Sequence, residues 1–151
     1  MTPFAADLLV LFRRDLRCFI REVELFPDDA TLWKTLPGIS NSAGNLALHV
    51  AGNLRHFVGG VLGGTGYQRN REQEFGQREG TRMAVSAALE AASVDIQAGL
   101  EKLTPESQAA PFPVSVGGRR CSSLCASLIW IPLTIAASAQ LSGHTDRKNV
   151  V

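Results

Sequence analysis

The stretch from Asn41 to His56, NSAGNLALHVAGNLRH, constrains the fold most, because its polar and its apolar residues both recur at helical spacing. Asn45, His49, Asn53 and His56 lie three or four residues apart, which places them within an arc of roughly 80° on an α-helix. The apolar residues between them cover a wider, adjacent arc. The pattern therefore predicts a helix that packs by its apolar face and carries two histidines on a polar stripe.

Similar apolar spacing, interrupted by glycine or proline, predicts a helical chain throughout. We expect helices over about residues 4–25, 40–62, 81–103 and from 118 onward. No segment shows sustained alternation of apolar and polar residues with β-branched enrichment, so strands are not expected. The predicted fold class is therefore all-α, an antiparallel four-helix bundle that forms a single domain over residues 1–151. A long connection joins the second helix to the third.

The ends and buried faces of these helices can also be predicted. Ser40 or Asn41 can cap the second helix, and Thr81 can cap the third. The core candidates are the apolar stripes of two helices: Leu8, Leu11, Phe12, Phe19 and Val23 in the first, and Met83, Ala87, Leu89 or Ala91, Val94, Ile96 and Leu100 in the third.

Composition and charge exclude several classes of protein. Fifteen basic and fourteen acidic residues leave a net charge of +1, and no block of like charge marks a nucleic-acid surface. At the N-terminus Asp7 precedes a short apolar run and Arg13 and Arg14 follow it, which reverses the order of a secretory signal. Three cysteines, an odd number, fit a reducing compartment better than a disulfide framework. We therefore expect a cytoplasmic protein that does not bind nucleic acid.

The stretch Cys121–Gly143 contains no charged residue and is long enough to span a bilayer. It contains several serines, a threonine, a glutamine and a central proline, Pro132, and is therefore less apolar than most membrane-spanning helices. A buried helix of the bundle explains the stretch better than a membrane anchor does, and membrane association is not expected.

His49 has two interpretations from the sequence alone. Ala47, Ala51 and Gly52 are small and allow another helix to approach closely, so His49 is expected to point into the bundle. A buried imidazole needs partners for both ring nitrogens, either hydrogen bonds or a metal. His49 is therefore either a structural histidine with hydrogen-bonded nitrogens or a ligand or catalytic group. His56 is expected at the periphery.

The predicted connection between the second and third helices carries Arg69, Arg71, Glu74 and Phe75 within a few residues. Such a mixture occurs in solvated loops with structural ion pairs. It also suits a subunit interface or a site for an anionic ligand group. Asn45, Asn53, Arg69 and Arg71 are therefore candidate pocket or interface residues.

The run LPGISNSAGNLALHVAGNLRHFVGGVLGG and the following YQRNREQEF resemble the DinB-like (YfiT-like) superfamily of bacterial four-helix bundle metalloenzymes. The resemblance covers about residues 1–105. It implies a divalent metal, zinc or nickel, held by one histidine on the second helix and a His-x-x-x-His pair on the fourth. It further implies a homodimer and, for some members, activation of a small thiol. His49 matches the first histidine.

The expected histidine pair is missing, since the two positions are occupied by Ala136 and Gln140. Alanine cannot coordinate a metal and a glutamine amide is a weak, neutral ligand, so a three-histidine centre cannot be assembled. His144 and Cys125 are not excluded as replacements by direction. However, Cys125 lies about 16 Å along the helix from Ala136, and His144 lies where the helix is expected to end, at Gly143. Cys121 and Cys125, four residues apart, are either a soft-metal pair or two packed small side chains. Three explanations of this divergent C-terminal part are open: loss of the site, a changed reading frame, or a sequence error.

Two functions follow from these observations. The favoured one is a DinB-like homodimer that has lost the usual metal site, needs no cofactor, and is non-catalytic or binds a small molecule. The alternative is a divalent-metal-dependent enzyme, a thiol transferase or hydrolase, that uses His49 with zinc or nickel and non-standard ligands.

Overall fold

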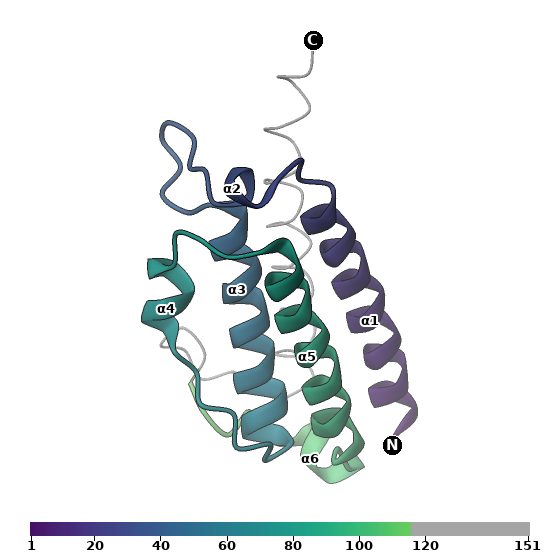
Figure 1. Ribbon diagram of the computed structural model, residues 1–151. Coiled ribbons are helices and arrows are strands. Elements are labelled where there is room, and N and C mark those ends of the chain that lie inside the picture. Colours follow the sequence, from purple (N-terminus) through teal and green to yellow (C-terminus); the bar gives the residue numbers. More distant parts are fainter. Residues whose placement is uncertain (116–151) are drawn as a thin grey trace.

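Three long helical rods lie side by side in the computed structural model, which describes residues 1–115 (Figure 1). They are α1 (Pro3–Glu24), α3 (Ala43–Leu54) with its continuation in the π-helix η1 (Arg55–Leu62), and α5 (Arg82–Glu101). The bounds of all three agree with the sequence prediction to within a few residues. Residues 1–115 contain no strand, so the described part of the chain is all-α, as predicted.

Three short helices, which the sequence did not predict, lie in the connections. They are α2 (Asp29–Leu32), α4 (Arg71–Gly76) and α6 (Pro105–Ala109). None is long enough to show a repeating apolar pattern, which explains why periodicity missed them. Each follows a residue whose side chain accepts a backbone N–H from the first turn: Asp28, Asn70 and Thr104.

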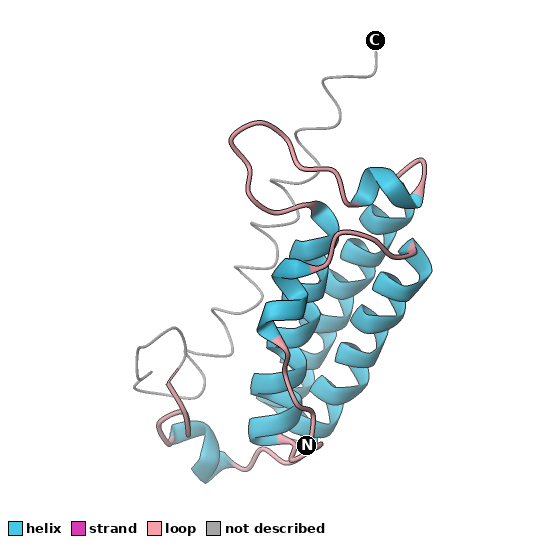
Figure 2. Ribbon diagram, turned by 60° about the vertical axis from the view of Figure 1, so that its left-hand side comes forward, coloured by secondary structure: helices cyan, strands magenta, loops and turns pink. Residues whose placement is uncertain are grey.

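The direction of the helices follows from the connections (Figures 1 and 2). α1 runs opposite to both α3 and α5. However, α3 and α5 run in the same direction, because residues 63–81 return along the full length of the helices before α5 begins. A strictly alternating arrangement is therefore not observed among these three helices. The segment expected to form the fourth helix lies outside the described residues.

No helix within residues 1–115 has the length and hydropathy to cross a membrane. The uncharged stretch Cys121–Gly143, for which we considered a membrane span, lies outside the described part of the chain.

The N-terminal cap of α3 differs from the prediction of Ser40 or Asn41. Ser42 caps the helix, since its hydroxyl accepts the backbone N–H of Asn45 at 3.2 Å. Asn45 returns the contact, because its side-chain oxygen accepts the backbone N–H of Ser42 at 3.2 Å. This reciprocal pair requires a spacing of three residues, which only Ser42 has to Asn45. Thr81 caps α5 as predicted.

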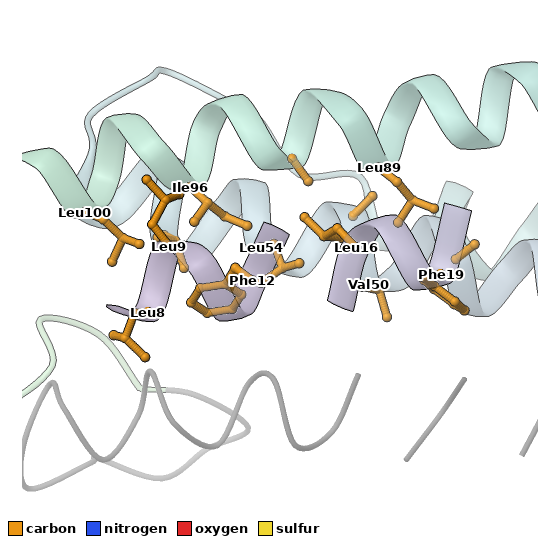
Figure 3. Close-up of a cluster of buried hydrophobic side chains, with 14 of the residues drawn as sticks. Leu8, Leu9, Phe12, Leu16, Phe19, Val50, Leu54, Leu89, Ile96 and Leu100 are labelled. Atoms are coloured by element: carbon orange, nitrogen blue, oxygen red, sulfur yellow. The ribbon is translucent and has the colours of Figure 1, made fainter. Parts of the chain in front are cut away.

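The core lies between α1, α3 and α5, as the buried side chains in Figure 3 show. Four of the five core predictions for α1 are confirmed: Leu8, Phe12, Phe19 and Val23. The fifth, Leu11, is wrong, since it lies on the solvent side of α1.

The core prediction for α5 was only half right. Leu89, Ile96 and Leu100 are buried. Met83 and Val94 are 79% and 69% exposed, and Ala87 is exposed too. The prediction failed because α5 carries apolar residues on both its inner and outer sides, so periodicity could not identify the buried face.

Glycines allow η1 and α5 to cross closely. A Cβ atom on Gly99 would lie 2.2 Å from the Val58 carbonyl oxygen, and one on Gly63 would lie 2.9 Å from the Gly99 nitrogen. Next to this crossing the Arg55 guanidinium donates to Asp95 at 2.7 Å. The crossing fixes one side of α5 against η1 and leaves its outer side uncovered by any described helix.

The two segments that lead into α3 and α5 are joined through Trp33. Its indole nitrogen donates to the Gly80 carbonyl oxygen at 2.8 Å. The ring packs on Gly44, where an added Cβ atom would lie 2.9 Å from the ring carbons. Trp33 is consequently only 7% exposed.

Candidate functional site

The polar stripe of α3 faces the 63–81 segment and forms one hydrogen-bonded network with it. The stripe contributes Asn45, His49 and Asn53, and the segment contributes Arg69 and Glu74. We call these five residues the His49 cluster. Asn45 and Glu74 are buried, and the other three are half-buried. The structure therefore brings together four of the residues singled out as candidate site residues, Asn45, His49, Asn53 and Arg69. It adds Glu74, which bonds directly to Asn45, His49 and Arg69, whereas Asn53 is joined through His49 and Arg69.

Glu74 lies at the centre of the cluster. Its Oε1 accepts from Arg69 Nε at 2.7 Å, and its Oε2 accepts from Arg69 Nη2 at 2.7 Å. This is the two-point geometry in which a guanidinium binds a carboxylate most strongly. The Nδ1 atom of His49 lies 2.9 Å from Oε2. Glu74 thus holds an arginine and a histidine with one carboxylate.

The hydrogen bonds of Asn53 identify the tautomer of His49. The side-chain oxygen of Asn53 accepts from Arg69 at 2.8 Å, so its amide nitrogen must face His49 Nε2, 3.1 Å away. Nε2 is therefore the acceptor, and Nδ1 carries the proton that it donates to Glu74. Arg69 Nη2 also lies 3.0 Å from Nδ1, but its acceptor is then Glu74 Oε2, at 2.7 Å. Both ring nitrogens have partners, and the Phe75 ring packs on the imidazole with centroids 4.6 Å apart.

Asn45 attaches the backbone of α4 to α3. Its side-chain nitrogen donates to the carbonyl oxygens of Glu74 and Gln77, both at 2.9 Å. Its side-chain oxygen accepts from Ser42. All the hydrogen-bonding groups of this buried amide are therefore used, and the end of the 63–81 segment is fixed to the first turn of α3.

Gly52 provides the space for the Glu74 carboxylate. A Cβ atom at position 52 would lie 2.0 Å from Glu74 Oε1 and 2.7 Å from its carboxyl carbon. We predicted that Gly52 would permit close approach of another helix. In the structure it accommodates a side chain from the 63–81 segment instead. The prediction of a close approach was therefore right, but the prediction that a helix makes it was wrong.

The ionisation of Glu74 depends on two opposing effects. Burial raises the pKa of its carboxyl group, but the hydrogen bonds and charge from Arg69 and the hydrogen bond from His49 outweigh burial, and the net pKa is lowered. Glu74 is therefore a carboxylate near neutral pH, balanced by the Arg69 guanidinium.

Arg71 and His56 lie outside the cluster. The Arg71 guanidinium lies 5.0 Å above the Phe75 ring, on the exposed side of α4. The His56 ring packs against Phe57, with centroids 4.7 Å apart. His56 departs from the stripe because α3 becomes a π-helix at Arg55, and the wider turn changes the direction of each following side chain.

The described residues do not fit a three-histidine metal centre. Within residues 1–115 no three His, Cys, Asp or Glu side chains are grouped closely enough to hold a metal ion. His49 and Glu74 are the only such residues in the cluster, and each is already hydrogen bonded. Ala136 and Gln140, where the resemblance places the other ligands, lie outside the described part of the chain, as do Cys121 and Cys125.

No family model, curated protein sequence or solved structure matches this chain.

Proposed function

We propose that this chain is a DinB-like four-helix bundle that forms a homodimer, has lost the usual three-histidine metal centre, and serves as a non-catalytic protein that binds a small molecule. The sequence motifs support the DinB-like assignment. The main support for the loss of metal binding is that both ring nitrogens of His49 have hydrogen-bond partners within the chain.

A metal on His49 would have to displace one of these partners. Freeing Nε2 requires the Asn53 amide to turn away, which would also break its 2.8 Å bond with Arg69. Freeing Nδ1 would remove the histidine from the buried Glu74 carboxylate. Either change leaves a polar group without a partner, which costs free energy. The cluster is therefore suited to holding the 63–81 segment against α3.

A small ligand would reach the cluster at His49, whose side chain is 26% exposed. The Phe75 ring packs on the imidazole, and the Arg71 guanidinium lies over the Phe75 ring. Arg71 therefore places a positive charge near His49. We therefore expect the ligand to carry an anionic group.

The alternative, a divalent-metal-dependent enzyme, is favoured by one feature. His49 donates its Nδ1 proton to a carboxylate, which is the orientation that metal-bound histidines commonly have. In that case the hydrogen bond from Asn53 to Nε2 would break, Nε2 would bind the metal, and the remaining ligands would be non-standard.

Metal analysis of protein purified without added metal separates the two functions. We expect no stoichiometric transition metal and no tight zinc binding in a calorimetric titration, because the resemblance predicts two of three ligands to be absent. The Ala136→His/Gln140→His variant is expected to gain zinc binding, and His49→Ala in that background is expected to lose it. Stoichiometric metal in the native protein that is lost in His49→Ala would contradict the proposal and support the enzyme.

A further inference from the structure

Residues 66–80 form a strap across the polar stripe of α3, and we call them the α4 strap. They include α4, which packs against α3 and lies on the side of α3 away from α1 and α5 (Figure 1). Glu74 is the only buried residue of the strap. The rings of Tyr67 and Phe75 are partly buried, and within residues 1–115 neither packs in the hydrophobic core. The strap therefore adds no apolar side chain to the core of the bundle.

Polar groups and partly exposed rings hold the strap in place. The His49 cluster joins its middle to α3. Near its start, the Arg55 guanidinium lies 4.0 Å above the centre of the Tyr67 ring. At its end, the Trp33 indole donates to the Gly80 carbonyl oxygen at 2.8 Å. Since polar groups find new partners in water when such contacts break, releasing the strap costs less free energy than exposing the core.

The residues on either side of the strap are attached to the bundle by contacts of their own. Before the strap, the Lys102 ammonium group of the α5 end donates to the Gly63 carbonyl oxygen. After the strap, Arg82 donates to the Asp29 carboxylate from its backbone nitrogen and from Nε, both at 2.9 Å. These contacts do not involve the strap. It therefore lies between two points of the chain that stay fixed when it is released.

A glycine occupies each end of the strap. Gly66 has a φ of 74° and Gly80 a φ of 143°, conformations that residues with a side chain rarely adopt. A Cβ atom on Gly66 would have no neighbour within 4 Å, so the space around this residue is open. The backbone can therefore change direction at both ends of the strap without moving η1 or α5.

The surface beneath the strap is polar and is separate from the core. The strap covers Asn45 and His49, and the core side of α3 carries Ala47, Val50 and Leu54. Release of the strap would expose the first pair to solvent. The three core residues would keep their contacts with the core side chains of α1 and α5.

We propose that the α4 strap opens as one unit while α1, α3, η1 and α5 stay packed, and that this opening uncovers the polar stripe of α3. The His49 cluster holds the strap closed. In the open form His49 and Arg69 lose their bonds to the Glu74 carboxylate and become accessible to solvent together with Gly52. This inference does not depend on the dimer, the ligand or the loss of the metal centre in the proposed function.

Hydrogen exchange in the native protein tests whether the strap opens separately. The backbone amides of Glu74 and Gln77 report on the strap, because each donates to the carbonyl oxygen four residues earlier, at 3.2 and 3.0 Å. A six-residue helix is not stable by itself, so these amides exchange when the strap is released. The amides of Leu89 and Ile96, in the buried part of α5, report on the bundle.

We expect the two strap amides to exchange at least about a hundredfold faster than the two α5 amides, after correction for their intrinsic rates. Their exchange should also depend little on urea below the unfolding transition, because opening exposes little apolar surface. Exchange of the α5 amides should increase steeply with urea, since it requires exposure of the core.

Two variants test whether the strap opens as one unit. Glu74→Gln is expected to accelerate exchange of the strap amides about a hundredfold, because the Arg69 guanidinium loses its carboxylate. Asn53→Ala, which removes a single acceptor from Arg69, is expected to accelerate it about tenfold. In each variant the amides of residues 74 and 77 should accelerate by the same factor to within about twofold. Glu72→Gln, on the exposed side of α4, is the matched control and is expected to change neither rate.

Two results would overturn this inference. Strap amides that exchange at the rate and with the urea dependence of Leu89 and Ile96 would show that the strap is released only when the bundle unfolds. A variant that accelerates one strap amide and not the other would show local fraying of α4 instead of a single opening. Asn53→Ala keeps the test available if Glu74→Gln fails to fold, and neither result alters the metal analysis.

Discussion

Gly52→Ala is expected to lower the free energy of unfolding by about 3 kcal/mol, although alanine in a helix normally stabilises by about 1 kcal/mol relative to glycine. The added Cβ atom would lie 2.0 Å from Glu74 Oε1, so the carboxylate would have to leave its position. Arg69 and His49 would then lose their common acceptor. Urea unfolding followed by circular dichroism measures the effect.

Two further variants test whether the clash with the Glu74 carboxylate causes this loss of stability. Gly60→Ala, in η1, is the matched control, because its Cβ atom would be 3.6 Å from its nearest neighbour, an ordinary contact. Gly52→Ala introduced together with Glu74→Ala should cost nothing beyond Glu74→Ala alone, since the clashing carboxylate is gone. If Gly52→Ala proves stabilising in the native background, the position of Glu74 against α3 is wrong.

Glu74→Gln is expected to cost about 3 kcal/mol of folding free energy at neutral pH, the effect of leaving one member of a buried ion pair without its partner. The Arg69 guanidinium, with a side chain only 14% exposed, would lose both of its carboxylate contacts. Glu72→Gln, on the exposed side of the same helix, should change stability by less than about 0.5 kcal/mol. Equal effects of the two substitutions would exclude a central role for Glu74.

The cost of Glu74→Gln should depend on pH in a defined direction. The folded structure lowers the pKa of Glu74 below its ordinary value of 4.5, so the carboxylate stabilises the fold fully above that value. This contribution is lost as the pH falls through the lowered pKa. The stability difference between the native protein and Glu74→Gln should therefore be largest at neutral pH and decrease below about pH 4.5. Chemical unfolding at several pH values provides the measurement.

The long helices could be predicted because their buried faces repeat at helical spacing. The outer side of α5 could not, because Met83 and Val94 continue an apolar pattern that periodicity assigns to the core. The change from α3 to a π-helix at Arg55 leaves no such signal, since it depends on the close crossing of η1 with α5. Sequence patterns therefore predicted the three long helices but not which of their sides are buried.

The α3 residues of the His49 cluster could be predicted from the sequence, but their partners could not. The spacing of Asn45, His49 and Asn53 predicted a shared side of one helix, and this side does carry the cluster. Their partners could not be predicted, because Arg69 and Glu74 reach the helix only through the path of the 63–81 segment. A buried carboxylate opposite a glycine is a contact between distant residues, for which a single sequence gives no signal.

The hydrogen bond between Trp33 and Gly80 supplies an optical reporter for the chain. The sequence contains two tryptophans, Trp33 and Trp130, so a Trp130→Phe background leaves one indole. That indole is buried and bonded to the carbonyl that precedes α5. Its fluorescence emission should therefore shift to longer wavelength when the end of the 63–81 segment detaches, even while the long helices keep their circular dichroism.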